Sequence, residues 1–455
     1  MSAGPIADGS RRQSAARGFL HHLHALLPRP AYALAVSGGP DSMSLLALAA
    51  AARRLAHAPH FTVLHVHHGL AADADEWAQR VERAARRADM PAEILFWRGA
   101  KPAHGLAAAA RTARYALLRA ACRARGLDGL VLAHHMEDQA ETVLMRLERG
   151  SQLGGLAAMA ARRSDGGVWL LRPFLHWRRA QLHRCQNPAY GRAVSDAANR
   201  DQRFARARLR AMAPALAAHG LTPPRLTRLA QVMERVQHVW DNSARRARQR
   251  LCRQDVCGWR IERAGFAALP PLLAQHLLRH LLRVPCPRAP RDFYAVRTRQ
   301  LAALQQNLCA GRRIGFSLGG FLLRLRAREI LLYREFAQVR RLPPLAVRAG
   351  TSVVWDGRVR LLPHLSGEIA ALGAEGVRCL RAMGAALPPW PVAAVMSSPG
   401  LWQNGRLRAS PFHPPPHDLP HALVFAPPNP YIYEAGKIHE GGHSRRALKS
   451  FLEIA

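Results

Sequence analysis

Residues 31 to about 175 alternate short apolar runs with longer amphipathic segments. This alternation is typical of a sheet of parallel strands, because parallel strands are joined by crossover connections, which are usually helices. We therefore expect an α/β fold with a parallel sheet in this part of the chain. The segments expected to be strands are 31–37, 61–67, 92–97, 128–133 and 168–174, and the expected helices lie near 41–56, 74–88, 105–125 and 137–149.

The rest of the chain follows other patterns. From about 176 to 340 it is rich in arginine and mostly of helical periodicity, and beyond 340 short apolar runs are broken by glycine and proline. A chain of 455 residues is too long for a single hydrophobic core. We predict three domains: an α/β domain over 1–215, a mainly helical domain over 216–340, and a small α+β domain over 341–455.

Positive charge dominates the composition. The chain has 66 lysines and arginines against 30 aspartates and glutamates, which gives a formal net charge of +36. Only Lys101, Lys437 and Lys449 are lysines, which suggests codon bias towards arginine, but such bias does not remove acidic residues. A polyanion is the natural partner of this surplus, because cationic side chains that neutralise phosphates release counterions. The composition therefore predicts a protein that binds nucleic acid.

The seven cysteines are scattered and contain no C-x-x-C pair, and the closest two are Cys252 and Cys257. This pattern disfavours a disulfide framework, a zinc ribbon and an iron–sulfur centre, so we expect buried thiols in a reducing cytoplasm. No apolar run is long enough to span a bilayer. We therefore expect a cytoplasmic protein without a membrane partner. The sequence leaves open whether the protein forms a homodimer.

The strongest local signal is a glycine-rich loop at the end of the first expected strand. Glycines allow a tight turn that aims backbone N–H groups at an anion, and the following helix adds the positive end of its dipole. The loop lacks the lysine of G-x-x-x-x-G-K-[ST], and its one charged residue, Asp41, suits Mg²⁺ beside phosphates. A plain strand-to-helix turn capped by Asp41 is the alternative. The residues expected to bind phosphate are Ser37, Gly38, Gly39, Pro40, Asp41 and Ser42.

The sequence S-G-G-P-D-S resembles the PP-loop of ATP pyrophosphatases, enzymes that split ATP into AMP and pyrophosphate. Further motifs resemble those of the tRNA(Ile)-lysidine synthetase family over about residues 30–215. These motifs are HVHHGL at 65–70, GLAAAARTARY at 105–115, LVLAHHMEDQAETVLMRLERGSQLGGL at 130–156, and VSDAANRDQRFARARLR at 194–210, which keeps Asp196, Asn199 and Asp201. Four positions depart from the family pattern, namely His67 for Asn, Ala107 for Glu, Glu137 for Asp and Ala197 for Pro.

The resemblance implies a PP-loop fold and an ATP-dependent ligase. Such an enzyme joins L-lysine to C2 of the wobble cytidine of tRNA(Ile) with a CAU anticodon, and it uses ATP and Mg²⁺. The tRNA is adenylated first, with release of pyrophosphate, and lysine then displaces AMP. On this basis Asp41 would hold Mg²⁺, and Arg111 would neutralise charge at the α-phosphate.

The same resemblance suggests where lysine and tRNA bind. Asp138 and Glu141 are three residues apart on an expected helix, so they would grip the ammonium group of lysine together. Alternatively, they only favour the helix N-terminus through its dipole. His134 is a candidate general base, which would otherwise orient a neighbour. Arg206 and Arg210 are four residues apart and would contact the tRNA backbone.

Two rival functions would also use a fold of this kind. A PP-loop tRNA sulfurtransferase needs a persulfide cysteine or a C-x-x-C cluster near its site, whereas Cys122 and Cys185 are lone residues. A non-catalytic RNA-binding protein that kept the fold would not need the intact glycine-rich loop together with Asp138 and Glu141. Both rivals are therefore disfavoured by the sequence.

Overall fold

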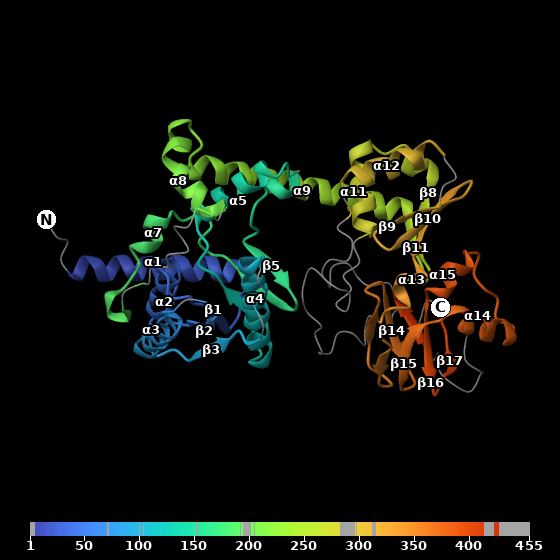
Figure 1. The fold of residues 1–455 in the computed structure, drawn as a ribbon, viewed down its shortest axis with the longest axis horizontal. Coiled ribbons are helices and arrows are strands. Elements are labelled where there is room, and N and C mark those ends of the chain that lie inside the picture. The colour runs from blue at the N-terminus through green and yellow to red at the C-terminus, as the bar shows by residue number, and fades with distance from the viewer. Residues whose placement is uncertain are drawn as a thin grey trace. The chain divides into compact units, whose positions relative to one another are not determined.

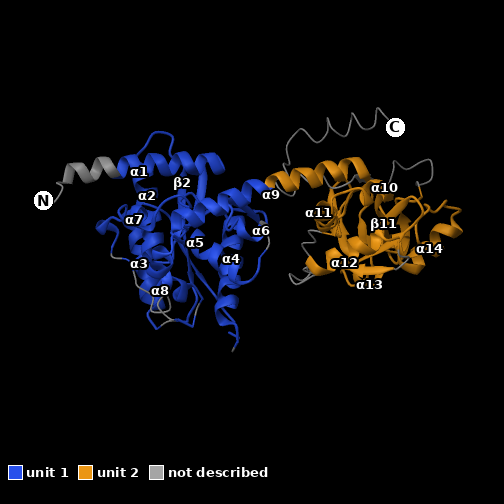
Figure 2. Ribbon diagram, turned by 90° about the horizontal axis from the view of Figure 1, so that it is seen from above, with its two compact units in different colours: residues 1–237, 431–455 blue, residues 238–430 orange. Residues whose placement is uncertain are grey.

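The computed structural model of the chain describes residues 5–413 and 423–426, except 71, 100, 103, 152, 192, 194–201, 204, 283–295, 297 and 312–314. Contacts group the described residues into two compact units, unit 1 up to Gln237 and unit 2 from His238 (Figure 2). The helix α9 (Pro223–Leu251) contributes residues to both units. The division after residues 215 and 340 stays a prediction.

Unit 1 is built around a six-stranded sheet with the order β3-β2-β1-β4-β6-β5. Figure 1 labels β1, β2 and β3 next to one another in this sheet. Neighbouring strands from β3 to β6 are parallel, and β5 pairs antiparallel with β6. The strands are β1 (Ala31–Ala35), β2 (His60–His67), β3 (Ala92–Phe96), β4 (Gly129–Val131), β5 (Arg162–Asp165) and β6 (Val168–Leu171). The helices are α1 (Pro5–Leu26), α2 (Pro40–Ala52), α3 (Ala74–Arg87), α4 (Leu106–Ala124), α5 (Met136–Glu148), α6 (Leu153–Leu156), α7 (Arg179–His183), the 3₁₀ turn Pro188–Tyr190, α8 (Ala205–Ala218) and the first part of α9.

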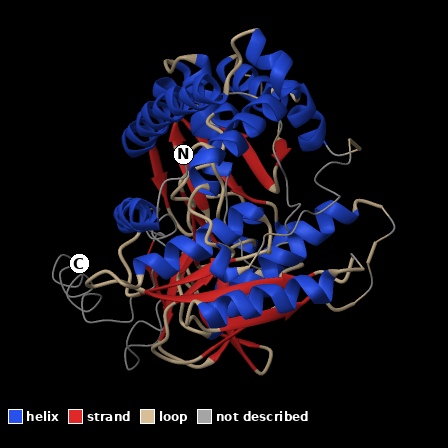
Figure 3. Cartoon of the chain, turned by 90° about the vertical axis from the view of Figure 1, so that its left-hand side faces the viewer, coloured by secondary structure: helices blue, strands red, loops and turns tan. Residues whose placement is uncertain are grey.

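Helices cover both faces of this sheet, and the side-chain alternation of β1 shows how. Tyr32 and Leu34 pack in a core with residues of α1, α2 and α3, whereas Ala33 packs in a second core with residues of α4. Figure 3 shows helices lying against the strands. α2 is apolar on nearly all sides and mostly buried, because it is packed against α1, α7 and the sheet. The carboxyl edge of β1, β2 and β4 is left for polar residues.

The prediction of an α/β fold with a parallel sheet is confirmed. All five expected strands and all four expected helices are present, with ends that differ by a few residues. The antiparallel strand β5 was not expected. It forms a hairpin with β6 through Gly166 and Gly167, which have φ angles of +60° and +86° that favour glycine.

Unit 2 combines helices with three antiparallel sheets, whose orders are β7-β8-β11-β10-β9, β12-β15-β16-β17 and β13-β14-β18. Its strands are β7 (Cys252–Gln254), β8 (Gly258–Glu262), β9 (Phe316–Leu318), β10 (Phe321–Leu325), β11 (Glu329–Arg334), β12 (Leu345–Val347), β13 (Val353–Trp355), β14 (Val359–Pro363), β15 (Gly367–Ala371), β16 (Pro399–Gln403), β17 (Arg406–Ala409) and β18 (Leu423–Ala426). Its helices are α10 (Arg263–Ala267), α11 (Pro271–Leu282), α12 (Thr298–Cys309), α13 (Phe336–Val339), α14 (Gly373–Ala382), α15 (Val392–Met396) and the end of α9.

The helices expected between 216 and 340 are present as α9, α11 and α12, which pack with the first sheet of unit 2 in one core. That sheet itself was not expected, because its strands are only three to six residues long and lie in a region rich in arginine and mostly of helical periodicity. Short strands and loops beyond 340 agree with the small α+β region that the sequence indicates. Among the described residues no helix is long and apolar enough to cross a membrane.

Candidate active site

Three of the sequence motifs meet at one edge of the parallel sheet. The glycine-rich loop follows β1, the HVHHGL motif ends β2, and His134 to Asp138 follow β4. These three strands are neighbours and parallel, so their carboxyl ends lie at the same edge. The sheet order reverses between β1 and β4, which is where open α/β sheets bind ligands. A cavity of about 810 Å³ lies there.

Most of the predicted site residues line this cavity. They are Ser37, Gly39, Pro40, Asp41, Ser42, Arg111, His134, Asp138, Arg206 and Arg210. Glu141 is buried one helical turn after Asp138 and contacts Arg210. Folding therefore gathers residues that lie up to 173 positions apart in the sequence, from Ser37 to Arg210.

The glycine-rich loop is held by its own side chains. Gly38 has a φ of +89°, and Gly39 directly precedes α2, which begins with Pro40. The hydroxyl of Ser42 accepts a hydrogen bond from the backbone N–H of Ser37 at 3.1 Å and donates one to the carbonyl of Gly39 at 2.9 Å. The first N–H groups of a helix have no partner within it, so the loop and the start of α2 can bind an anion.

Asp41 is anchored by two histidines. Its Oδ1 lies 2.7 Å from Nε2 of His183 on α7 and 3.5 Å from Nε2 of His135. Burial raises the pKa of the Asp41 carboxyl, but His135, then His183 and Arg179, more than offset this and hold that pKa well below its usual range. Asp41 is therefore a carboxylate at neutral pH and is oriented by its partners.

His135 is the centre of the buried charges at this edge. It has no exposed surface, and Glu137 lies 3.0 Å from Nδ1, while Asp138 and Asp41 each lie 3.5 Å from Nε2. Burial lowers the pKa of His135, but the nearby carboxylates of Asp41, Glu137 and Asp138 raise it to about 9. Nε of Arg179 lies 3.3 Å from Nε2 of His135. This contact is a hydrogen bond only if Nε2 carries no proton. With three carboxylates around the ring, we favour the imidazolium.

His135, His183 and Arg179 were not predicted as site residues. A sequence signal was available for α7, because this segment follows the last expected strand of the parallel sheet. In the structure Arg179 and His183 of α7 line the cavity at the carboxyl edge of that sheet. Glu137 ties this helix to α5, since it accepts hydrogen bonds at 2.8 Å from Nε of Arg178 and from the backbone N–H of Arg179. Burial raises the pKa of Glu137, but His135, then Arg178 and Arg179, lower it to about 2.

Asp138 and Glu141 lie side by side on α5, and both are only 6% exposed. Both face arginines of α8. Glu141 accepts hydrogen bonds from Nε of Arg210 at 2.6 Å and from its Nη2 at 3.3 Å, and Asp138 Oδ1 lies 3.6 Å from Arg210 and 3.8 Å from Arg206. The structure thus joins the two residue pairs that the sequence assigned to lysine and to tRNA.

Asp138 also has a local role in α5. Its Oδ2 accepts a hydrogen bond at 3.1 Å from the backbone N–H of His135, the residue before the helix. One oxygen of Asp138 therefore interacts with the start of the helix, as the alternative interpretation of this residue expects. The other oxygen faces Arg206 and Arg210, and the assignment of Asp138 to lysine stays a prediction.

Arg111 and Arg114 project from α4 into the cavity lining and both lie over the ring of Tyr115, at 5.2 and 5.4 Å from its centroid. Arg111 is exposed, whereas Arg114 is half-buried. Burial lowers the pKa of Arg114, which Tyr115 partly offsets. Two guanidinium groups on one face of the cavity provide charge for an anionic ligand.

Two histidines of the cavity are kept neutral. Burial, and then charges that include Arg172 and Arg206, lower the pKa of His134 to about 3, although Asp138 opposes this. Burial and the charge of Arg114 lower the pKa of His68 to about 4. The imidazole of His134 therefore carries a lone pair at neutral pH, but it is a weak base while the arginines surround it.

Parts of two motifs have other roles or cannot be placed. His65 is buried, and its Nδ1 is 2.8 Å from the carbonyl of Val36, so this histidine joins the ends of β1 and β2. His67 contacts Asp75 at 3.0 Å. Asp196, Asn199 and Asp201 of the fourth motif lie outside the described residues.

The chain matches the family model described as a PP-loop domain over residues 12–216. It is 41% identical to a tRNA(Ile)-lysidine synthase of Bradyrhizobium diazoefficiens over 314 residues, which are 67% of this chain and 87% of the relative. The chain belongs to the tRNA(Ile)-lysidine synthase family. A tRNA(Ile)-lysidine synthase of Ruegeria pomeroyi is 33% identical over 410 residues, 87% of this chain and 92% of the relative. The similarity to the family therefore extends well into unit 2.

Within the tRNA(Ile)-lysidine synthase family, this chain carries ATP-binding machinery of the PP-loop kind. The glycine-rich loop lies within the matched residues, and the arginines of α4 line the same cavity as most of this loop. Glu137, which stands where the sequence motif usually has Asp, keeps a carboxylate between His135 and α7. Ala107, the departure on α4, is exposed.

Proposed function

We propose that this chain is a tRNA(Ile)-lysidine synthetase that joins L-lysine to C2 of the wobble cytidine of a CAU anticodon and consumes ATP. The observation that carries the proposal is that the glycine-rich loop and the buried carboxylate of Asp138 line one cavity, with the buried carboxylate of Glu141 beside Asp138 on α5. The loop suits the phosphates of ATP, and the carboxylates suit a cation. Lysine modification needs both, because ATP activates the cytidine and lysine carries a positive charge.

ATP binds with its phosphates on the loop Ser37 to Ser42 and at the start of α2. Backbone N–H groups and the helix dipole attract the phosphates there. Arg111 neutralises charge that develops at the α-phosphate, and Arg114 beside it reinforces this charge. Arg111 is exposed and able to move onto the nucleotide, whereas Arg114 is held more tightly by burial.

The residues at the loop fit Mg²⁺. This ion is commonly held by one or two carboxylates together with substrate phosphates. Asp41 supplies an ionised carboxylate beside the loop, and His183 and His135 orient it. Mg²⁺ would be bound by Asp41 and would supply positive charge to the leaving pyrophosphate.

The reaction has two steps. The O2 oxygen of the cytidine attacks the α-phosphate of ATP, the bond to the β-phosphate oxygen breaks, and pyrophosphate leaves. The ε-amine of lysine then attacks C2, the bond between C2 and the adenylate oxygen breaks, and AMP leaves while the amine loses a proton. This chain's part is to align the reactants and to exclude water from the activated cytidine.

Lysine is held through its α-ammonium group by Asp138 and Glu141. Arg206 and Arg210 occupy these carboxylates when lysine does not, since a guanidinium and an ammonium group compete for the same oxygens. Binding of tRNA phosphates draws Arg206 and Arg210 away from α5. Arg206 and Arg210 thereby bind the tRNA and, at the same time, leave the carboxylates of the lysine site free. This arrangement would favour binding of tRNA before binding of lysine.

His134 accepts the proton of the lysine amine once the site is loaded. Burial is the largest cause of the low pKa of His134, and charges that include Arg172, Arg206 and Arg114 add to it. Phosphates of ATP and tRNA that neutralise Arg206 and Arg114 remove part of this depression and so make the imidazole a stronger base. The same imidazole is a weak base while the site holds only arginines.

The sulfurtransferase alternative has little support. None of the described residues that line the cavity is a cysteine. Cys122 is buried, and burial raises the pKa of its thiol to about 12, while burial also raises the pKa of Cys185. Neither thiol is activated for sulfur transfer. The six described cysteines are free, in keeping with a reducing cytoplasm.

The test is incorporation of labelled lysine into purified tRNA(Ile) with a CAU anticodon. Label should enter the tRNA only when ATP is present, and AMP should be released in equal amount. A tRNA with uridine at the wobble position is the control and should take up no label. Release of pyrophosphate without any transfer of lysine would move the chain to another PP-loop activity.

A further inference from the structure

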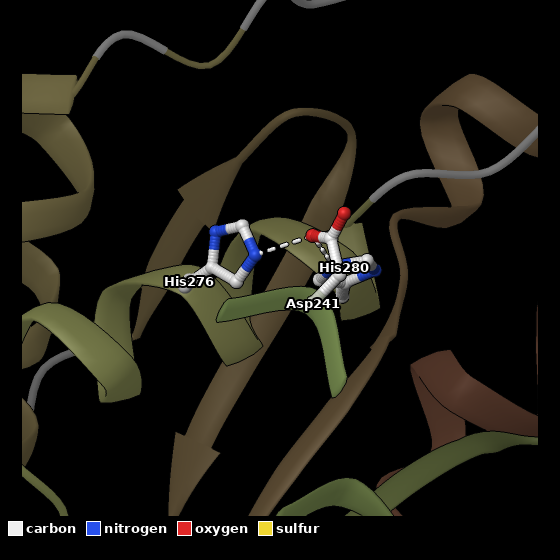
Figure 4. Close-up of side chains that lie close together, drawn as sticks. All are labelled: Asp241, His276 and His280. Atoms are coloured by element: carbon white, nitrogen blue, oxygen red, sulfur yellow. Dashed lines mark hydrogen bonds and ion pairs between the residues drawn. The ribbon is translucent and has the colours of Figure 1, made fainter. Parts of the chain in front are cut away.

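A second cluster of aspartate and histidines lies in unit 2. Asp241 is on α9, and His276 and His280 lie one turn apart on α11 (Figure 4). Oδ1 of Asp241 is 2.7 Å from Nε2 of His276 and 3.2 Å from Nε2 of His280. One ligand atom from each residue lies within 4.8 Å of the other two. Within the described part of the chain these three residues are the one such group found.

We propose that Asp241, His276 and His280 bind a divalent transition metal ion, with Zn²⁺ as the preferred ion. A tetrahedral zinc with bonds of about 2.0–2.1 Å places its donor atoms about 3.3–3.4 Å apart. The two distances from Asp241 are within about 0.7 Å of that separation. The third pair, the nitrogens of His276 and His280, lies within 4.8 Å, so the two imidazoles have to approach each other for the ion to bind.

The type of donor selects the metal. Two imidazole nitrogens and one carboxylate oxygen suit Zn²⁺, Co²⁺ or Ni²⁺, whereas Mg²⁺ prefers oxygen donors alone. Two histidines four residues apart on a helix present their rings on one side, as helical zinc-binding motifs do. Three protein ligands leave a fourth position for water. The His276 side chain is 12% exposed, and those of Asp241 and His280 are 33% and 37% exposed, so an ion can enter.

Neighbouring arginines limit the affinity. Arg245 follows Asp241 by one turn of α9, and Arg279 lies between the two histidines in sequence. Both have interactions of their own, and Arg279 donates a hydrogen bond to Thr298 at 3.1 Å. Their positive charge opposes a cation, and protons compete with metal for the imidazoles. Zinc binding should therefore be reversible and should weaken in acid.

The consequence of the site is mechanical. Asp241 precedes Ala247 and Leu251 on α9, which pack in one core with Leu277 and Leu281 of α11. A bound ion would join the two helices before the point at which apolar packing takes over. It would therefore stabilise the end of the long helix within unit 2.

Zinc titration of the untagged, full-length chain, after treatment with a chelator, tests the proposal. We expect one Zn²⁺ per chain that excess Mg²⁺ does not displace, and more than about tenfold weaker binding in each of Asp241→Asn, His276→Gln and His280→Gln. Zn²⁺ should also raise the melting temperature of the unchanged chain but not of these variants. His238→Gln, an exposed histidine on α9, and Asp41→Asn, in the histidine-rich cluster of unit 1, are controls that should bind as before.

Equal zinc binding in all variants, or loss of binding in Asp41→Asn alone, would overturn the proposal. X-ray absorption spectroscopy of the unchanged chain with one equivalent of Zn²⁺ gives a measure that does not depend on whether a variant folds. Two imidazole ligands with oxygen ligands are expected, and a shell without two imidazoles would contradict the assignment.

Discussion

Two clusters of aspartate and histidine occur in this chain, and they differ in what surrounds them. In unit 1, Asp41 and His135 lie beside a glycine-rich loop and the start of a helix, with further carboxylates and arginines around them. In unit 2, Asp241 lies within α9 and is shared by two imidazoles of α11. We propose that the same residue types serve phosphate and Mg²⁺ in one place and a zinc ion in the other. Backbone donors and nearby charge decide which.

The largest effect is expected from Asp41→Asn, which removes the charge of the cluster in unit 1 and keeps its shape. Pyrophosphate release should fall by about a thousandfold, because the proposed Mg²⁺ ligand is lost and His135 and His183 lose an anionic partner. Asp75→Asn is a matched control, since Asp75 pairs with His67 at 3.0 Å but is 85% exposed. Equal activity of the two variants would remove Asp41 from the reaction.

The second expected effect concerns lysine. Asp138→Asn and Glu141→Gln should each raise the KM for lysine by about one to two decades, because one charge-assisted hydrogen bond is worth roughly 1.5–3 kcal/mol. Adenylation of tRNA does not involve lysine, so the adenylated intermediate should accumulate. Glu148→Gln, at the exposed end of the same helix, is the control. Equal loss of adenylation and lysine transfer would instead assign these carboxylates to Mg²⁺ or to the helix scaffold.

A smaller effect separates the two uses of the arginines of α8. Arg210→Gln should lower the KM for lysine several-fold, because a competitor for Glu141 is weakened, and should raise the KM for tRNA about tenfold or less. Arg208→Gln, an exposed neighbour on α8, should leave the KM for lysine unchanged. A rise in both KM values in Arg210→Gln would mean that Arg210 orients Glu141 for lysine and does not compete with it.

The smallest effect is a dependence of stability on pH. The pKa of His135 is raised from 6.5 to about 9, so its stabilising contribution is complete below pH 6.5 and is lost as the pH rises through 9. Asp41 and Glu137 have lowered pKa values, so the contribution of these two carboxylates to stability is lost only in acid. The difference in melting temperature between the unchanged chain and His135→Gln should shrink by a few degrees from about pH 6.5 to 9.5.

His65 provides the control for that measurement. Burial lowers the pKa of His65, so its contribution is complete above pH 6.5 and should stay constant up to pH 9.5. A difference for His135→Gln that is equally constant would show that His135 is neutral in the fold. The Arg179 contact at 3.3 Å would then be a hydrogen bond to its ring.

The sequence was sufficient for the parallel sheet and for the loop at Ser37 to Ser42, because both depend on local patterns. It also placed Asp138 and Glu141 on one helical face. It could not show that Arg210 bonds to Glu141, since the two residues are 69 positions apart. The anchoring of Asp41 by His183 was missed for the same reason, with 142 positions between them. Long-range pairing of charges depends on how the helices pack, which no local pattern records.

The most direct test of the account is a two-stage, single-turnover experiment. The chain is first mixed with ATP, Mg²⁺ and tRNA(Ile) with a CAU anticodon, and labelled lysine is added afterwards. We predict that one pyrophosphate per active site is released before lysine is added, and that lysine then enters the tRNA with release of AMP and no further pyrophosphate. Pyrophosphate release that requires lysine but not tRNA would mean that lysine itself is adenylated, which would contradict the proposed mechanism.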